Sequence, residues 1–229
     1  AGRAAYIHDL VRPGMLHAKI KFSEHAHARI VRIDTSRAER LPGVRAVITA
    51  HNTPEIRLGF LRDNVVLKGS VVRHFRDEVA AVAAIDPDIA AAAIELIEVE
   101  YEPLDAVFTI AEALAEGAPL VHQSDARGNP LTSNRLSIDV AHRSGDVAAA
   151  ERSAAHIAEG EFSTQLMQQS CMGTAGCIAE LDERGNLTIW AKTQIPFLAQ
   201  RDFNRALDAM GLGGRNARVQ LLTNGGRLR

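Results

Sequence analysis

The chain has 229 residues, with 26 lysines and arginines against 28 aspartates and glutamates and a formal net charge of −2. Hydrophobic residues make up 46% and charged residues 24%, which is ordinary for a globular protein and excludes a disordered tail, a collagenous repeat and a coiled coil. The balanced charge argues against a nucleic-acid-binding protein, because such proteins carry a basic face. The length fits one large domain or two small ones.

Neither a secretory signal nor a membrane segment is recognisable in the sequence. No charged segment followed by an apolar run opens the chain, and no stretch approaches the roughly 18 apolar residues that a spanning helix needs. Cys171 and Cys177 lack the spacing of a zinc or redox motif, so we expect two buried thiols in a reducing compartment. The sequence predicts a cytoplasmic protein, and the missing initiator methionine indicates processing, trimming or a fragment.

Short strands and short helices alternate in the first half of the chain. Asp86-Pro87-Asp88 has the composition of a helix start. The strand 79–85, the helix 89–96 and the strand 97–101 follow one another in the order of a crossover unit. Period-two alternation and turn residues predict the other elements, which are strands over 15–22, 27–34, 44–49 and 71–75, short helices over 37–41 and 110–115, and a loop over 52–70.

A segment rich in Gly, Pro, Ser, Asn and Asp over 117–134 is the best candidate linker. We therefore divide the chain into a first domain over 1–125, a linker over 126–134 and a second block over 135–229. The turn composition of 182–186 predicts a β-hairpin between strands 177–181 and 187–191. The second block is also predicted to contain strands over 136–141, 155–163 and 218–222 and helices over 145–152 and 196–210, so the fold class is mixed α+β.

Residue spacing alone indicates no catalytic centre. His25 and His27 could share one face of a strand, but no third ligand follows at a recognisable spacing, and polar residues at a strand edge are favoured over a metal pair. The carboxylates of the run 95–102 alternate with apolar residues and are expected to face solvent. The chain has neither a nucleophile elbow nor a Walker loop.

Polar and glycine residues at strand ends are the candidates for ligand binding. Gln169 precedes a predicted strand and Gln194 follows one; amide side chains there can hydrogen-bond a cofactor or only a turn, and the turn is favoured. Gly225 and Gly226 follow the last predicted strand, where a phosphate-cradling loop would sit, which two glycines alone do not establish.

An ordered series of short phrases resembles the large, molybdenum-binding subunit of the xanthine dehydrogenase and aldehyde oxidase family. The phrases of the first block include Pro13-Gly-Met-Leu-His-Ala-Lys19, His25-Ala-His-Ala-Arg-Ile30, Asp77-Glu-Val-Ala-Ala-Val82 and Val99-Glu-Tyr-Glu-Pro-Leu104. Those of the second are Gly145-Asp-Val147, Glu159-Gly-Glu-Phe162, Leu187-Thr-Ile-Trp190 and Thr193-Gln194. The resemblance implies a hammerhead-type α/β domain followed by the first, incomplete part of a molybdopterin-binding domain.

The resemblance also implies a chemistry. A molybdenum–pterin cofactor would hydroxylate or reductively dehydroxylate a heterocycle, an aldehyde or an aromatic acyl-CoA, with [2Fe–2S] clusters and FAD on partner subunits or domains. The candidate cofactor-binding residues are then Gln169, Gln194, Gly225 and Gly226. The phrase at 77–82 leans toward the hydroxybenzoyl-CoA reductase and nicotinate dehydrogenase branches.

The sequence departs from the family pattern at several positions. Gln169 and Met172-Gly173 stand where the family has a His and a Met-Glu pair, Arg76 replaces a glycine, and no Phe lies between the glycines at 225–226. The later cofactor loops and the catalytic glutamate are expected beyond this sequence, so no residue is assigned a catalytic or metal-binding role.

We therefore expect part of a molybdenum enzyme, or a split subunit of one, that is inactive alone. It would assemble with the remaining molybdenum-domain chain and with iron–sulfur and FAD subunits, through an apolar surface left exposed on 135–229. The alternative is a non-catalytic, hammerhead-type remnant or scaffold that binds partner subunits. Binding of nucleic acid or membrane is not expected.

Overall fold

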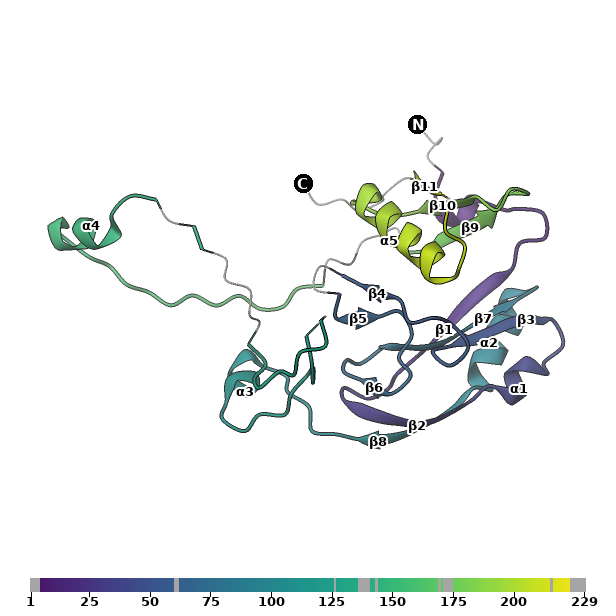
Figure 1. The fold of residues 1–229 in the computed structure, drawn as a ribbon, viewed down its shortest axis with the longest axis horizontal. Helices are drawn as coiled ribbons and strands as arrows, with labels where there is room; N and C mark the ends of the chain where they lie inside the picture. Colours follow the sequence, from purple (N-terminus) through teal and green to yellow (C-terminus); the bar gives the residue numbers. More distant parts are fainter. Residues whose placement is uncertain are drawn as a thin grey trace.

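The computed structural model describes residues 5–59, 62–125, 127–135, 141–142, 144–168, 170, 175–214 and 216–222. Small sheets and short helices are mixed along these residues (Figure 1), which confirms the predicted α+β class. Within the described residues the first half forms one body, the end of the chain forms a second, and an arm extends away from both (Figure 1).

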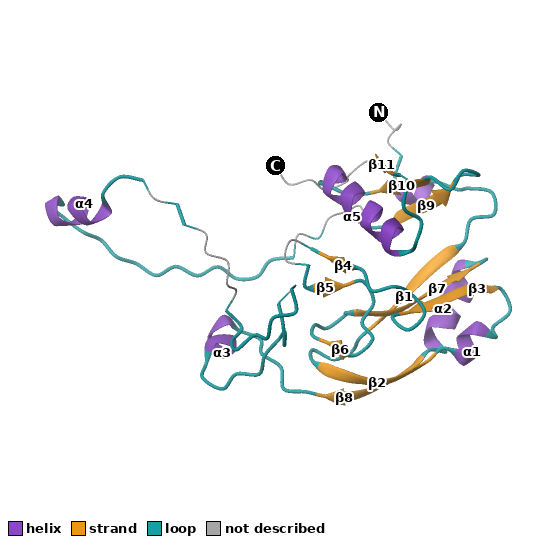
Figure 2. Ribbon diagram, viewed as in Figure 1, coloured by secondary structure: helices purple, strands orange, loops and turns teal. Residues whose placement is uncertain are grey.

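The first sheet has the strand order β1-β7-β3 and is antiparallel throughout. Its central strand β7 (Glu78–Ala84) lies between β1 (His17–Phe22) and β3 (Val44–Thr49). Helices α1 (Ser36–Glu39) and α2 (Pro87–Glu95) pack against this sheet (Figure 2). The packing buries an apolar cluster that consists of Ala38, Val47, Ala80, Val82, Ala93, Ile94 and Ile97.

The second sheet has the order β6-β2-β8 and is also antiparallel. Its central strand β2 (Ala28–Asp34) lies between β6 (Val71–Val72) and β8 (Glu98–Pro103). Val79 of β7 belongs to the apolar cluster of this sheet, and Ile33 and Val99 pack against the clusters of both sheets, so the two clusters adjoin. On β8 the glutamates face solvent and Val99 and Tyr101 face inward, as the alternation predicted.

The predicted crossover unit over 79–101 is wrong, although its three elements are present. Asp86 caps α2 as expected, because its Oδ1 accepts hydrogen bonds from the backbone N–H groups of Asp88 and Ile89. However, β7 already has a strand on each side, so it offers β8 no free edge. α2 therefore connects two different sheets, and β8 pairs with β2.

The region 52–70, predicted as a loop, contains a two-stranded ladder of β4 (Arg57–Leu58) and β5 (Asn64–Val65). The segment after α3 (Ile110–Leu114) was proposed as a linker. Asn134 holds this segment together, because its Nδ2 donates to the carbonyls of Ala113 and Pro119 and its Oδ1 accepts from the N–H of Val121. The domain boundaries drawn from composition remain predictions.

The end of the chain forms a third sheet with the order β11-β10-β9. β9 (Cys177–Leu181) and β10 (Leu187–Ala191) form the predicted hairpin, and Asp182 closes its turn by accepting from the N–H groups of Arg184 and Asn186. β11 (Ala217–Leu221) runs parallel to β10, and α5 (Pro196–Ala209) connects the two. Cys177 is exposed, contrary to the expectation of two buried thiols, because it opens an edge strand; Cys171 lies outside the described residues.

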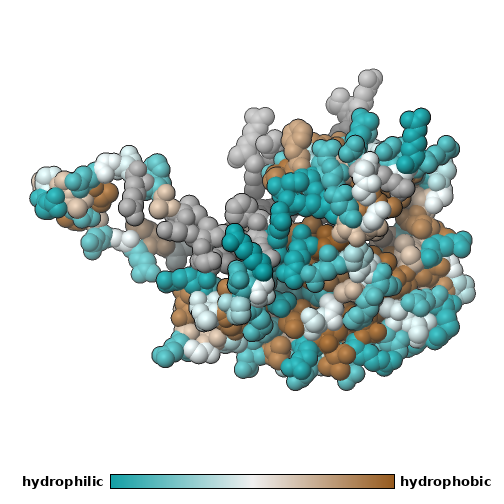
Figure 3. Space-filling model, in the orientation of Figure 1, coloured by the Kyte–Doolittle hydropathy of each residue, from teal (hydrophilic) through white to brown (hydrophobic). Residues whose placement is uncertain are grey.

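The arm carries α4 (Val147–Ser153) and continues as extended chain over 154–168 (Figure 1). The strand predicted over 155–163 is wrong, because the segment lies in no ladder with any strand that the structure describes, and a strand needs a partner for its N–H and C=O groups. The strand predicted over 136–141 falls largely outside the described residues. Hydrophobic residues are open to solvent on this arm (Figure 3), with Phe162 94% exposed and Leu166 fully exposed.

The amino-terminal segment packs against the third sheet. After the 3-10 turn η1 (Ile7–Asp9), the guanidinium of Arg12 lies 4.4 Å from the centre of the Trp190 ring, and its Nε lies 3.8 Å from the Glu180 carboxylate. These contacts join the beginning of the chain to β9 and β10.

Candidate functional site

The parallel strands β10 and β11 end at the same edge of the third sheet. Ala191 pairs with Leu221 at the last position of the ladder, and the N–H of Leu222 donates to the carbonyl of Ala191 at 3.3 Å. Ligands of open α/β sheets bind outside the carboxyl ends of parallel strands, because the loops that leave two neighbouring strands diverge there. This carboxyl edge is therefore the part of the sheet best placed to bind a ligand.

The amino terminus of α5 lies at this carboxyl edge, since the helix starts after β10 and returns the chain to the beginning of β11. Gln200 donates to the carbonyl of Ala217 at 2.7 Å, and Asn204 accepts from the N–H of Ala217 at 2.8 Å, so the helix is fixed against β11. Its N-cap residue, Ile195, provides no side-chain acceptor for the first turn. The N–H groups of that turn, together with the helix dipole, can therefore stabilise an anionic group.

Of the four predicted cofactor-binding residues, the structure places one. Gln194 lies between the end of β10 and the start of α5, and its side chain is exposed at the carboxyl edge. Gln169, Gly225 and Gly226 lie outside the described residues, so their role stays a prediction. The start of α5 is not among the ligand-binding candidates predicted from sequence, although Pro196 directly after a strand and a short polar loop is a usable signal.

The two histidines considered as a metal pair have separate contacts. The ring of His25 lies 4.8 Å from that of Tyr101 between centres, and Nδ1 of His27 is 2.5 Å from the carbonyl oxygen of Asp105. Within the described residues no three His, Cys, Asp or Glu side chains converge in a way that could hold a metal ion.

A cavity of about 430 Å³ lies beside the β4–β5 ladder and extends to the segment 122–124. Its charged groups pair with one another: Nε of Arg57 is 2.6 Å from Oε1 of Glu55, and Nε2 of His122 is 3.7 Å from Oδ2 of Asp63. Lys68 is also neutralised, by two carboxylates. Arg73 also lines this cavity and forms no ion pair among the described residues, whereas the other charged groups named here are paired.

His122 makes the folding stability of the protein depend on pH, and this dependence can be measured. Burial, followed by the positive charge of Arg73, lowers the pKa of His122 below its ordinary value, against the opposing effect of Asp63. The unfolded state therefore binds a proton more readily than the folded state, and stability is lost as pH falls through the unfolded value of about 6.5 toward the lower folded value. The partial exposure of the His122 side chain keeps this effect on stability small.

We expect the His122→Gln variant to lose less stability than the original protein between about pH 7.5 and pH 5.5. Urea unfolding at the two pH values measures the difference, and His74→Gln, at an exposed histidine, is the matched control. If the pH dependence of stability is unchanged in His122→Gln, His122 does not titrate differently in the folded and unfolded states.

Two family models match consecutive parts of the chain. The aldehyde oxidase and xanthine dehydrogenase a/b hammerhead domain matches residues 1–105, and the molybdopterin cofactor-binding domain matches residues 129–226. Together these matches cover most of the sequence, and the third sheet with its carboxyl edge lies inside the second. The chain thus combines a hammerhead domain with part of a cofactor-binding domain.

Individual relatives agree with this class. The chain is 34% identical over 208 residues to the carbon monoxide dehydrogenase large chain of Afipia carboxidovorans, covering 85% of this chain and 26% of that one. It is 32% identical over 227 residues to the nicotinate dehydrogenase large molybdopterin subunit of Eubacterium barkeri, covering 98% and 51%. The solved structure of reconstituted CO dehydrogenase from Oligotropha carboxidovorans superimposes with a TM-score of 0.77 at 32% identity, covering 98% and 29%.

The chain belongs to the xanthine dehydrogenase and aldehyde oxidase family and corresponds to the N-terminal portion of its molybdenum-binding subunit. It spans between about a quarter and a half of the length of these relatives. No helix among the described residues is both long and apolar enough to cross a bilayer.

Proposed function

We propose that this chain forms the first part of the molybdenum-binding subunit of an oxidoreductase, and that it works together with further polypeptide that completes the cofactor site. The observation that carries the proposal is the carboxyl edge of β10 and β11, where Gln194 and the uncapped start of α5 lie together inside the molybdopterin-domain match. This donor set suits an anionic, hydrogen-bonding cofactor better than it suits a bare metal ion.

The residues present fit one end of such a cofactor. The amide of Gln194 can both donate and accept hydrogen bonds, as the edge of a pterin requires. The N–H groups of the first turn of α5 suit the negative charge of a phosphate. Gly225 and Gly226 come shortly after Leu222 in the sequence and are proposed as a further part of the same site. When bound, the molybdenum–pterin group would supply the oxygen-transfer and redox chemistry, while this chain binds and orients it.

The proposed reaction is hydroxylation or reductive dehydroxylation of a heterocycle, an aldehyde or an aromatic acyl-CoA. The names of relatives include carbon monoxide, nicotinate and xanthine dehydrogenases, so the family match does not select one substrate. Electrons would pass to [2Fe–2S] clusters and FAD carried by partner chains, and we propose a cytoplasmic location for the assembly.

Metal and pterin analysis tests this proposal. We expect little molybdenum on the purified chain alone, and about one molybdenum per chain when it is co-produced with the polypeptide that completes the domain. In that assembly Gln194→Leu should weaken cofactor binding by about 5-fold or more, because leaving a polar group of the cofactor without its hydrogen-bond partner costs roughly 1–3 kcal/mol. Gln168→Leu, at an exposed glutamine on the arm, is the matched control.

Molybdenum should be measured by elemental analysis and the pterin by fluorescence after oxidation. Stoichiometric molybdenum on the isolated chain would disprove the need for further polypeptide. If no candidate partner confers molybdenum binding, the scaffold alternative, a hammerhead-type module that binds subunits without a cofactor, would replace the proposal. Equal losses of cofactor binding in the two glutamine variants would show that Gln194 is not part of the cofactor site.

A further inference from the structure

A second cavity, separate from the carboxyl edge of the third sheet, lies at one end of the second sheet. Because β2 runs antiparallel to both β6 and β8, the start of β2 and the ends of β6 and β8 meet at the same edge, where Ala28 pairs with both Val72 and Pro103. The residues before β2 and after β6 and β8, with Pro119 and Val121, line a cavity of about 220 Å³. The topology of the sheet therefore creates this cavity.

One cation, Arg73, lies among otherwise mostly apolar walls. Its Nε donates to the carbonyl of Val121 at 2.6 Å and its Nη1 to the carbonyl of Val71 at 3.4 Å. A guanidinium has five N–H donors, so three of them have no acceptor among the residues that the structure describes. Burial lowers the pKa of Arg73 from its ordinary value, and Asp77 opposes this change. A half-buried cation whose remaining donors are not used by the protein favours an anionic acceptor.

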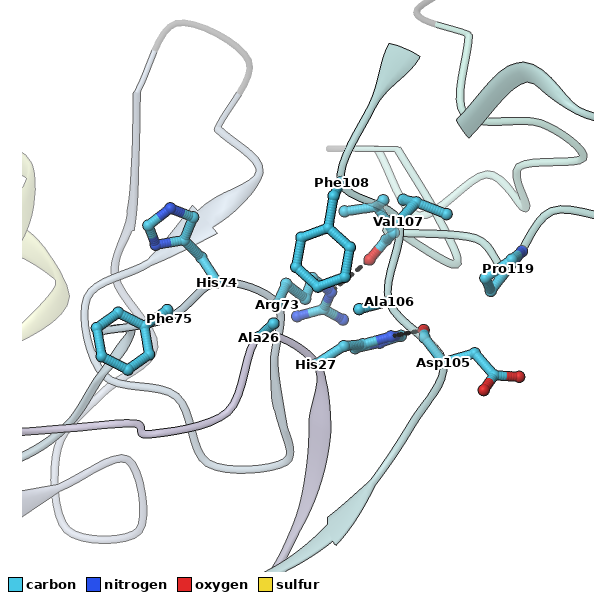
Figure 4. Close-up of a pocket in the computed structure, with 11 residues that line it drawn as sticks. Ala26, His27, Arg73, His74, Phe75, Asp105, Ala106, Val107, Phe108 and Pro119 are labelled. Atoms are coloured by element: carbon cyan, nitrogen blue, oxygen red, sulfur yellow. Dashed lines mark hydrogen bonds between the residues drawn. The ribbon is translucent and has the colours of Figure 1, made fainter. Parts of the chain in front are cut away.

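The carboxylates nearest in sequence do not satisfy these donors. Oδ2 of Asp77 accepts from the backbone N–H groups of Arg73 and His74, and Oδ1 lies 3.5 Å from Nζ of Lys68. Figure 4 shows the Asp105 carboxylate directed away from Arg73. The carbonyl of Asp105 accepts a hydrogen bond from Nδ1 of His27, since a carbonyl oxygen can only accept, and this bond fixes the tautomer of that ring. The side chain of Arg73 is thus positioned without a carboxylate partner.

The residues that line this cavity indicate what kind of chemical group would be attached to the anion. Ala26, Ala106, Val107 and Pro119 are apolar, and the rings of Phe75 and Phe108 are 55% and 77% exposed beside the cavity (Figure 4). Covering an exposed aromatic ring with a flat apolar group is favourable, because it removes apolar surface from water. Pockets for drug-sized molecules have volumes of about 300–1,000 Å³, so this smaller cavity is suited to a single ring or a branched aliphatic group.

We propose that this cavity binds the carboxylate of a compact apolar acid of the size of benzoate, with the guanidinium of Arg73 pairing with the carboxylate and Phe108 covering the apolar group. A planar carboxylate matches the fork of a guanidinium, which can donate two parallel hydrogen bonds. A phosphate ester is disfavoured, because the cavity provides one guanidinium and neither a lysine nor a cluster of backbone N–H groups. The residues that line the cavity, from Ala26 to Val121, precede the match to the molybdopterin cofactor-binding domain, so the site does not depend on the molybdenum cofactor.

Binding of sodium benzoate to the chain tests the proposal by calorimetry and by chemical-shift changes of the arginine Nε–H signals. We expect saturable binding with a Kd of about 0.1–10 mM, as befits so small a ligand. Benzamide, which lacks the charge, and acetate, which lacks the ring, should each bind at least about 10-fold more weakly. Arg73→Gln should weaken benzoate binding at least about 10-fold, whereas Arg29→Gln, at an exposed arginine of β2, should not.

Arg73 also fixes two backbone carbonyls, so its variant could lose structure as well as affinity. Phe108→Asp keeps Arg73 and its hydrogen bonds, and should weaken benzoate binding by placing a like charge beside the carboxylate. Circular dichroism confirms that each variant is folded. Non-saturable shifts, equal binding of benzamide and benzoate, or unchanged affinity in Phe108→Asp would each overturn the proposal.

Discussion

Replacement of Lys68 by Met is expected to lower the free energy of unfolding by about 2–3 kcal/mol. The side chain of Lys68 is only 5% exposed, and its Nζ lies 2.7 Å from Oε2 of Glu78 and 3.5 Å from Oδ1 of Asp77. Met fills a similar volume but removes the charge, so two carboxylates that faced a cation would face an apolar group. The loss stays below the roughly 3–5 kcal/mol of fully buried pairs because Glu78 is partly exposed and can recover water.

Urea unfolding followed by circular dichroism measures this change, and Lys19→Met is the control, because Lys19 is an exposed lysine on β1. We expect the control to change stability by less than about 0.5 kcal/mol. Similar losses in both variants, or none in Lys68→Met, would show that the buried ion pair does not stabilise the fold. Lys68 also donates its backbone N–H to the carbonyl of Glu78, which Met preserves.

The arm should cause the protein to associate with itself or with a partner, and two side chains should carry most of the effect. Phe162 is 94% exposed and Leu166 fully exposed, on extended chain that makes no ladder in the described structure. Full burial of such side chains gains about 1.5–3 kcal/mol each. Phe162→Ser combined with Leu166→Ser should therefore weaken association by about 100-fold or more.

Sedimentation velocity over a range of protein concentrations measures the association. The matched control combines Val11→Ser with Ile110→Ser, since these side chains are each 80% exposed but lie outside the arm. A protein that stays monomeric at high concentration would contradict the prediction. Equal weakening in the control would indicate non-specific association through any exposed apolar group.

Local signals in the sequence predicted most elements of the structure. Asp86-Pro87 marks the start of α2, because the aspartate caps free N–H groups and proline suits the first turn. The composition of 182–186 predicts the β9–β10 hairpin, since Asp182 supplies the acceptors that close the turn. These features depend on residues within one turn of each other, so the sequence contains them directly.

Only part of the candidate site could be predicted from the sequence. Gln194 was selected for its position after a strand, and the structure places it beside the start of α5. Neither strand alone indicates that β10 and β11 are parallel. Because they are parallel, the loops that follow them leave the same edge of the sheet. Gln169, Gly225 and Gly226 remain predictions that rest on the resemblance to the family.

By itself, the sequence determined the α+β class, the family, and the positions of most strands and helices. Only the tertiary structure decided which strands pair. Local sequence predicts strands over both 79–85, an unbroken apolar run, and 155–163. In the structure β7 pairs with a strand on each side, whereas 155–163 pairs with none of the described strands. The physical reason is that the N–H and C=O groups of a strand are satisfied by partner strands that can lie far away in the chain, as β8 does from β2, and a local pattern does not identify such a partner.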